Sequence, residues 1–250
     1  MKAHQRIIRE KKENEKFENN LFGEYYKEIN VDISKSVVME VNRKTAEKII
    51  LEYEWLGTMG TTNLYYGIMF DGVCAGVVCY GYFQALAGYS GYVGEKYGKK
   101  GIQLSRGACV FWAHPHSASK LIGKSLQNVS KLGYKYVIAF SDSEAGEIGT
   151  VYQATNWHYL GIDPTAGKTN KGHFYLKQNG RKWMDDRDFN KRYGFKNLDK
   201  FLIDNPEIKK VVTKPKARYI KLIGNKTENK HMMKYLKDKI LPYPKRNKNG

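Results

Sequence analysis

The sequence predicts an α/β protein with a mixed, partly parallel central sheet flanked by helices and followed by a basic C-terminal extension. Two strand-like apolar runs, residues 64–70 and 73–80, flank Asp71 and Gly72, a pair that favours a tight antiparallel hairpin. Further along the chain, strand-like runs alternate with helical patterns, which is typical of crossover connections between parallel strands. A sheet that contains both kinds of pairing satisfies both observations.

Charge and apolar patterning divide the 250 residues into three predicted segments. Residues 1–34 form a charged, helix-prone N-terminal extension without a clear apolar face. Residues 35–180 carry the α/β pattern and form the main domain. Residues 181–250 form the basic C-terminal extension. The hydrophobic fraction of 41% is sufficient for a buried core.

Within residues 35–180, the spacing of apolar residues predicts the elements in order. They are a strand at 37–41, a helix at 45–53, the two hairpin strands, a strand at 102–112, a helix at 119–132, a strand at 134–140, a short helix at 147–154, and strands at 158–162 and 173–177. Residues 87–101 are rich in Gly and Tyr and show no periodicity. We therefore expect a mobile or substrate-contacting loop there.

Apolar runs and cysteine usage indicate the cellular setting. No stretch is long and apolar enough to span a membrane, and the N-terminus lacks the apolar core of a signal peptide. We therefore expect a cytoplasmic protein that does not bind a membrane. Cys74, Cys79 and Cys109 lie in apolar runs without the spacing of a zinc site or a disulfide framework. They are expected to be buried free thiols.

The net charge of +18 is concentrated toward the C-terminus. From residue 207 to the end, twelve Lys and two Arg stand against three acidic residues, a net of +11. Tyrosines alternate with these cations, as on surfaces where cations hold phosphates and rings stack on bases. Nucleic acid is the expected partner, ahead of an anionic membrane, and a solvated surface is the plain alternative. The predicted nucleic-acid-binding residues are Lys214, Lys216, Arg218, Tyr219 and Lys221.

The order of elements over residues 36–178 resembles the GNAT acyltransferase fold. In that fold two central parallel strands splay apart, an acyl-CoA enters the gap, and the helix after the fourth strand presents its N-terminus to the cofactor pyrophosphate. Residues 114–123, HPHSASKLIG, occupy that position here, without the usual Gly-rich loop. The resemblance implies acetyl-CoA or a related acyl donor, bound by Ser117, Ser119 and Lys120.

Three stretches together resemble the Mom family of phage DNA-modification proteins. They are LSRGACVFWAHPHSASKLIG at 104–123, AFSDSEAGEIGTVYQATNWHYLG at 139–161, and KARYIKLIGNK at 216–226 with LPYPK at 241–245. In that family a GNAT-like domain converts the exocyclic N6 amine of adenine in double-stranded DNA to a carbamoylmethylated amine, which protects phage DNA from restriction. The resemblance implies a DNA-modifying transferase, with functional positions at Arg106, Ser119, Asp142 and Tyr152.

Arg106 and Asp142 fall near the ends of neighbouring predicted strands. One interpretation is a structural ion pair, which is expensive when buried. In the functional interpretation Asp142 accepts from the adenine amine or acts as a base, and Arg106 orients it or neutralises a developing anion. Tyr152 either donates a proton or stacks on a flipped base, or it packs in the core. Ser119 is expected first of all at the N-cap of its helix.

The family resemblance also associates iron with the activity, but it assigns no ligands in this sequence. His114 and His116 stand two residues apart in a predicted loop, so both imidazoles could reach one ion, with Asp142 as a carboxylate ligand. Paired histidines in a loop also occur as solvent-facing or hydrogen-bonded side chains. The metal ligands are therefore left unassigned.

Three classes of function are consistent with the sequence. The first is an enzyme that modifies adenine in DNA. The second is a GNAT N-acyltransferase that uses acetyl-CoA on a small amine or a protein lysine, for which the basic extension would be incidental. The third is a non-catalytic nucleic-acid-binding protein, in which Arg106 and Asp142 would be structural.

Overall fold

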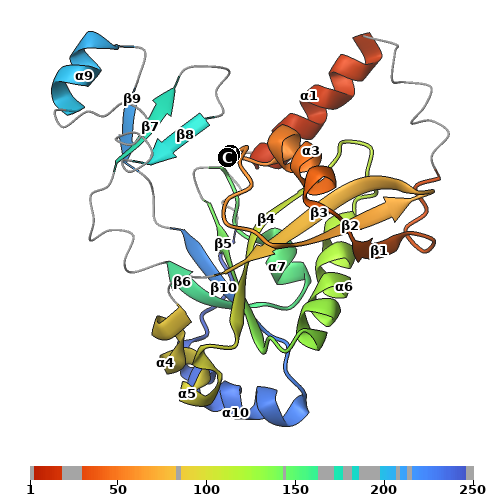
Figure 1. Ribbon diagram of the computed structural model, residues 1–250, viewed down its shortest axis with the longest axis vertical. Helices are drawn as coiled ribbons and strands as arrows, with labels where there is room; N and C mark the ends of the chain where they lie inside the picture. The colour runs from red at the N-terminus through yellow and green to blue at the C-terminus, as the bar shows by residue number, and fades with distance from the viewer. Residues whose placement is uncertain are drawn as a thin grey trace.

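A seven-stranded sheet forms the centre of the computed structural model, which describes residues 3–18, 30–82, 86–142, 145–162, 172–176, 182–185, 198–206, 209–212 and 216–245 (Figure 1). The strand order is β1-β2-β3-β4-β5-β10-β6. These strands are β1 (Val37–Glu40), β2 (Leu64–Phe70), β3 (Val73–Gly81), β4 (Gly101–Cys109), β5 (Tyr136–Ser141), β6 (His158–Ile162) and β10 (Ala217–Leu222). Of the pairings between these described strands, β4 with β5 is parallel and the others are antiparallel. The predicted mixed, partly parallel sheet is confirmed.

Helices lie at both ends of the strands and beside the sheet (Figure 1). The longer ones are α1 (His4–Glu18), α3 (Arg43–Tyr53), α6 (Ser117–Lys131) and α10 (Lys226–Leu236), and the shorter ones are α4 (Ser90–Val93), α5 (Glu95–Gly98), α7 (Thr150–Ala154) and α9 (Leu198–Asp204). α3 begins after Asn42, whose side chain accepts a hydrogen bond from the backbone N–H of Thr45. Both α3 and α6 bury apolar residues against β2, β3 and β4.

The hairpin predicted around Asp71 and Gly72 is confirmed. Both residues have positive φ, 45° and 81°, and Phe70 pairs with Val73 across the turn. This is the backbone conformation that the Asp-Gly pair favours, because Gly has no Cβ to clash and Asp tolerates the left-handed region. Turn chemistry therefore sets the antiparallel register of β2 and β3.

The strand predicted at 173–177 lies outside the central sheet. It corresponds to β7 (Gly172–Leu176), which pairs on one side with β8 (Lys182–Asp185) and on the other with β9 (Lys209–Val212). These strands form a separate three-stranded sheet in the order β8-β7-β9. The sequence pattern identified the strand but not its partners, because both partners come from the segment assigned to the extension.

The C-terminal segment supplies a strand of the central sheet. β10 lies between β5 and β6 and pairs antiparallel with both. Its residues Tyr219 and Ile220 are fully buried. The segment at 181–250 is basic, as predicted, but β10 is part of the same sheet as residues 35–162 rather than an appendage to it.

The Gly- and Tyr-rich stretch predicted as a loop forms short helices instead. The 3-10 helix η1 (Leu86–Tyr89) is followed by α4 and α5, and Tyr89, Val93 and Tyr97 are buried. These side chains form a second apolar cluster with Met232 and Leu236 of α10. A helix of a single turn is too short to show a repeating apolar pattern in the sequence. The buried residues of these helices pack against α10, which lies far away in the chain.

All three cysteines are free; Cys79 and Cys109 are buried and Cys74 is partly buried. Burial raises the pKa of the Cys79 and Cys109 thiols to about 12, so both stay protonated and inert at neutral pH. Within the described parts of the chain, no helix has both the length and the apolar character needed to cross a membrane.

Candidate active site

The parallel pair of strands opens at the point where the predicted catalytic residues begin. Pairing between β4 and β5 ends at Leu104 and Ala139. Both strands continue past these residues, β4 as far as Cys109 and β5 as far as Ser141. Past these residues β4 still pairs with β3 and β5 still pairs with β10, but β4 and β5 no longer pair with each other.

β4 carries a bulge at the same level of the sheet. On its β3 side, Cys79 pairs with Arg106, whereas Tyr80 pairs with Leu104, so Ser105 is an extra residue on β4. A bulge bends its strand and re-aims the neighbouring side chains. The irregularity thus separates β4 from β5 and sets the direction of Arg106.

The guanidinium of Arg106 is hydrogen-bonded to Thr58 in the segment after α3 and to Ser105 beside it on β4. Nε donates to the Thr58 carbonyl at 2.7 Å, Nη2 donates to the Thr58 hydroxyl at 3.2 Å, and Nη1 donates to the Ser105 carbonyl at 2.7 Å. Nε also lies 3.8 Å from a carboxylate oxygen of Glu54, and both side chains are largely buried. A Cβ at Gly60 would lie 3.1 Å from Nη2, so the backbone there approaches the guanidinium closely.

Glu54 is the acidic partner that sequence reasoning missed. It follows the last residue of α3, and its Oε2 accepts hydrogen bonds from the backbone N–H groups of Leu56 and Gly57 at 2.8 and 3.2 Å. Burial raises the pKa of its carboxyl group. The charge of Arg106, the two backbone hydrogen bonds and the charge of Lys216 act in the opposite direction.

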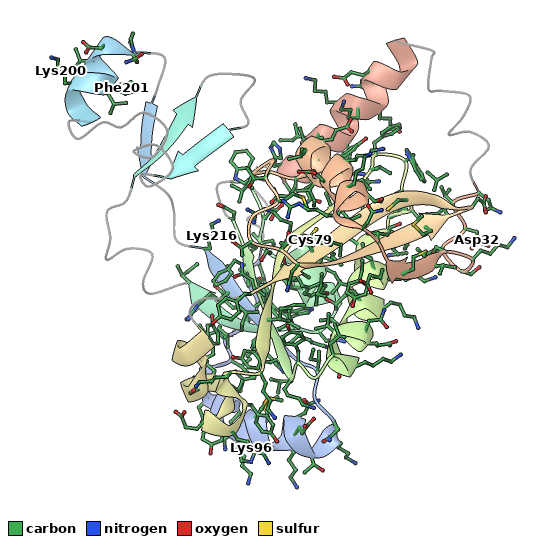
Figure 2. All side chains as sticks on the ribbon, in the orientation of Figure 1. Asp32, Cys79, Lys96, Lys200, Phe201 and Lys216 are labelled. Atoms are coloured by element: carbon green, nitrogen blue, oxygen red, sulfur yellow. The ribbon has the colours of Figure 1, made fainter. Side chains whose placement is uncertain are left out.

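Asp142 follows β5 and forms an ion pair with Lys216, whose Nζ lies 3.2 Å from Oδ2. Asp142 is largely buried, whereas Lys216, which precedes β10, is 39% exposed and lies near one end of β10 in Figure 2. The carbonyl of Asp142 accepts from the backbone N–H groups of Ala145 and Glu147. The loop after β5 therefore turns back toward its own start. Arg106 thus pairs with Glu54, and Asp142 pairs with Lys216.

Glu147 is the second functional candidate that sequence reasoning missed. Burial, together with the negative charges of Glu54 and Asp142 and against the opposing charge of Lys216, raises the pKa of its carboxyl group to about 7. A carboxyl group with this pKa exchanges a proton readily near neutral pH, which is the property of a general acid or base. The pKa of Glu147 therefore depends on residues of both ion pairs, namely Glu54 of one and Asp142 and Lys216 of the other.

Tyr152 of α7 packs beside this carboxyl group within an aromatic cluster. Its ring centroid lies 5.0 Å from that of Trp157 and 5.2 Å from that of Tyr219. Burial, with the Glu147 carboxylate as a further cause, holds the pKa of the Tyr152 phenol far above its usual value. Tyr152 is thus a packed residue that keeps its proton, so the phenol can donate a hydrogen bond but does not act as a base.

Two buried polar atoms beside the aromatic cluster have no hydrogen-bond partner among the described residues. They are Oγ of Ser141, the last residue of β5, and Nε1 of Trp157. Both side chains are almost completely inaccessible to solvent, at 1% and 0% exposure. Buried polar groups without partners carry a free-energy cost, and they gather at sites where a ligand supplies the missing partner.

The predicted cofactor-binding residues lie in the first turn of α6, which begins two residues earlier than expected. The N-cap is His116 rather than Ser119, and the Ser119 hydroxyl donates to the His116 carbonyl at 3.0 Å. Lys120 donates to the carbonyls of Ile33 and Ser36 at 2.6 and 2.7 Å, so its ammonium group anchors the segment before β1. The expected N-cap role of Ser119 is wrong, because the loop enters the helix earlier.

Ser117 is the first residue of α6 and differs from its neighbours. It is completely buried, and its hydroxyl has no hydrogen-bond partner among the described residues. The first turn of a helix also leaves backbone N–H groups without helical acceptors. Ser117 therefore combines an unpartnered hydroxyl with the positive end of a helix dipole.

The histidine pair is arranged as a turn. Nδ1 of His114 accepts a hydrogen bond from the backbone N–H of His116 at 3.1 Å, and the two rings lie 5.4 Å apart. In the part of the chain that the structure describes, no group of three or more His, Cys, Asp and Glu side chains is placed to hold a metal ion. The residues described do not fit an iron site.

The predicted nucleic-acid-binding residues have different environments. Arg218 donates to the Tyr92 hydroxyl at 3.2 Å and to the Leu160 carbonyl at 3.1 Å. Lys221 donates to the carbonyls of Thr155 and Asn156, both at 2.9 Å.

Tyr219 is fully buried, Lys216 pairs with Asp142, and Lys214 lies outside the described residues. Three of the five predicted side chains, Arg218, Tyr219 and Lys221, are thus committed to the sheet, because the stretch is strand β10.

The fold and the cluster define an α/β protein with a buried group of carboxyl side chains near the point where the pairing of two parallel strands ends. The chain belongs to the Mom protein family, whose family model matches residues 35–245. No curated protein sequence matches this chain.

Several solved acetyltransferase structures follow a similar course of the chain. An IAA acetyltransferase from Bacillus cereus is 10% identical, with a TM-score of 0.41 over 75% of this chain and 99% of that one. A Bacillus subtilis acetyltransferase in complex with CoA is 9% identical, with a TM-score of 0.42 over 75% and 97%. The ribosomal-protein-S18-alanine N-acetyltransferase from Escherichia coli is 9% identical, with a TM-score of 0.42 over 76% and 94%.

Proposed function

We propose that this protein is a transferase that modifies the exocyclic N6 amine of adenine in double-stranded DNA, by carbamoylmethylation, and so protects phage DNA from restriction. The observation that carries the proposal is membership of the Mom family over residues 35–245. The acid–base cluster supports it, because transfer to an amine requires a group that takes up a proton.

The cluster supplies the proton chemistry of such a transfer. A bond forms between N6 and a carbon of the donor, and the bond between that carbon and the leaving group breaks, with its electron pair passing to the leaving group. One N6 proton moves to the carboxylate of Glu147, whose pKa of about 7 suits uptake at neutral pH. Asp142, held by Lys216, accepts a hydrogen bond from the amine, and Tyr152 donates one toward the leaving group.

Arg106 acts on this reaction through Glu54. Its guanidinium holds the segment after α3 by two hydrogen bonds to Thr58 and supplies the charge next to the Glu54 carboxylate. Glu54 in turn raises the pKa of Glu147. In the proposed mechanism Arg106 and Glu54 are positioning residues, which set the geometry and the proton affinity of the residues that contact the substrate.

The first turn of α6 fits the phosphate groups of an acyl-CoA donor. The unpartnered Ser117 hydroxyl, at the positive end of the α6 dipole, is the donor that a pyrophosphate would accept from. When bound, such a donor would supply an acyl group from its thioester, which accounts for acylation of an amine, whereas a carbamoylmethyl group requires a donor whose methylene carbon bonds to N6. Ser119 and Lys120 border the same turn, although each already donates to protein carbonyls.

Mass spectrometry of nucleosides from the DNA of cells that express the protein tests the proposed function. We expect a modified deoxyadenosine whose added mass corresponds to a carbamoylmethyl group on N6. Cells that express the Asp142→Asn variant at the same level are the control and should yield unmodified deoxyadenosine. An unmodified profile from well-expressed wild-type protein would contradict the proposal.

A second candidate function, N-acylation of a small amine or a protein lysine with acetyl-CoA, is favoured by one observation. Arg218 and Lys221, which were predicted to bind DNA, are bonded to protein groups in the sheet. Incubating the purified protein with acetyl-CoA and a mixture of polyamines and lysine peptides distinguishes the two. Acetylated amines in the absence of any DNA adduct would favour this second function.

A further inference from the structure

A row of exposed lysines lies on one side of α10. Lys226, Lys230 and Lys234 recur every four residues, and Lys237 follows in the 3-10 helix η2 (Lys237–Lys239). The buried residues of α10, Met232 and Leu236, lie on the opposite side, because a helix turns by about 100° per residue. The fold therefore holds these four lysines toward solvent.

The segment that contains α5 lies alongside α10 and adds further lysines. The ring of His231 lies 5.5 Å from that of Tyr97, Tyr235 packs against Gly94, and Lys239 donates to the Gly91 carbonyl at 2.7 Å. The two segments therefore run in opposite directions side by side.

Lys96 and Lys99 are exposed on the α5 side of this contact, and Figure 2 shows Lys96 at the end of the molecule formed by α4, α5 and α10. We call Lys96, Lys99, Lys226, Lys230, Lys234 and Lys237 the lysine face.

The lysine face is not neutralised by neighbouring acidic residues. Glu228, the one acidic residue within α10, is in the capping box of the helix and pairs with Lys135 at 2.8 Å. The other acidic residues of these segments are Glu95 and Asp238, against six lysines. Among the described residues, no ion pair is formed by any lysine of the face. Lysines four residues apart on one helix repel each other, so the row is stabilised by an anionic partner.

The dimensions of the face match a nucleic-acid backbone. The row from Lys226 to Lys237 extends about 16 Å along the helix, a length over which one strand of B-DNA presents about five phosphates. Each lysine can therefore lie opposite a different phosphate.

The face and the candidate active site lie at opposite ends of β5. Tyr136, at the start of β5, donates to the Gly98 carbonyl beside the face, whereas Asp142, after its end, belongs to the active site. Six residues of strand extend about 20 Å, which corresponds to about six base pairs along a duplex.

We propose that the lysine face binds the phosphate backbone of double-stranded DNA, about six base pairs from the adenine that enters the active site. The proposal rests on the proposed function for its choice of polyanion. Because lysines contact phosphates without reading bases, this contact positions the protein on any sequence and leaves target preference to the active site. The lysine face would also provide phosphate contacts that Arg218 and Lys221 of β10 do not offer, because both are hydrogen-bonded to protein groups.

The test is the salt dependence of binding to a duplex of about 20 base pairs made only of G·C pairs. Such a duplex contains no adenine, so binding to it is independent of any modification reaction. The face variant carries Lys226→Gln, Lys230→Gln, Lys234→Gln and Lys237→Gln. The control variant carries Lys35→Gln, Lys44→Gln, Lys48→Gln and Lys124→Gln, four exposed lysines on other elements, and has the same net charge.

Each phosphate contact contributes about 0.9 to the slope of log affinity against log salt. We therefore expect the face variant to lose up to about 4 units of slope, whereas the control variant retains the wild-type slope. Equal slopes for the two variants would overturn the proposal, even if adenine modification were observed.

Vesicles of phosphatidylserine and phosphatidylcholine provide the comparison with a membrane. Loss of vesicle binding by the face variant, with DNA binding unchanged, would also overturn the proposal and assign the face to a lipid surface.

Discussion

The ammonium group of Lys216 lies 3.2 Å from the carboxylate of Asp142, and this ion pair joins the residue before β10 to the residue after β5. Lys216 also lowers the pKa values of Glu54 and Glu147. A single lysine from the C-terminal segment therefore pairs with Asp142 and favours the charged forms of Glu54 and Glu147, which lie far from it in the sequence.

Replacing Lys216 should shift the pH dependence of activity. In Lys216→Met, the positive charge that lowers the pKa of Glu147 is absent, so the acid limb of the pH–activity profile should move to higher pH. Lys216→Arg keeps the charge and is expected to keep the profile. The measurement is the rate of adenine modification between pH 5 and 9 at matched protein levels. An acid limb that stays in place in Lys216→Met would show that Glu147 is not the titrating group.

Glu147→Gln should stabilise the folded protein at high pH while it abolishes modification. The carboxyl pKa is about 7 in the folded state against 4.5 when unperturbed, so the folded state binds more protons between these values. The contribution of the Glu147 carboxyl group to stability is complete below pH 4.5 and is lost as the pH rises to about 7. Because Gln does not ionise, Glu147→Gln avoids this loss and should raise the free energy of unfolding by on the order of 3 kcal/mol above pH 7.

Denaturant unfolding of wild type and Glu147→Gln at pH 5 and pH 8 measures this gain. The difference between the two proteins should be much larger at pH 8. Glu13→Gln, on the exposed surface of α1, is the matched control and should show no pH-dependent difference. If Glu147→Gln is less stable than wild type at pH 8, the carboxyl group has a structural role as a charged group.

Arg106→Lys should destabilise the protein although the charge is kept. Lysine cannot reproduce the planar fork that donates to the Thr58 carbonyl, the Thr58 hydroxyl and the Ser105 carbonyl. We expect a loss of about 2–4 kcal/mol in the free energy of unfolding. Thr58→Val removes only the hydroxyl contact and should cost about 1 kcal/mol. Chemical denaturation measures the stability of both variants. A loss of less than about 0.5 kcal/mol in the free energy of unfolding of Arg106→Lys would contradict the positioning role.

Lys221→Met should reduce stability without changing the salt dependence of DNA binding. Its ammonium group donates to the carbonyls of Thr155 and Asn156 just after α7, and burial lowers its pKa. Loss of these bonds should cost about 1–3 kcal/mol. Thermal unfolding measures the cost, and a salt titration measures the slope. A flatter slope of log affinity against log salt in Lys221→Met would show that Lys221 contacts DNA phosphates.

The sequence predicted those elements whose signals are local. The Asp71-Gly72 turn identified the β2–β3 hairpin, the periodic apolar residues identified α6, and β6 begins and ends where the pattern predicted. The carboxylates Glu54 and Glu147 were missed, because an acidic side chain has the same sequence signature whether it is solvated or buried. A weak signal existed for each, since Glu54 follows the apolar face of an amphipathic helix and Glu147 stands between small and apolar residues.

By itself, the sequence determined the fold class, the hairpin and the stretches that mark the Mom family, because turn chemistry, periodicity and motif identity are properties of neighbouring residues. Only the tertiary structure decided that β10 enters the sheet between β5 and β6. That insertion commits Arg218 and Lys221 to protein carbonyls and brings Lys216 to Asp142. Strand pairing and burial join residues that are distant in the chain, and desolvation, which sets the proton affinity of Glu147, arises only from that packing.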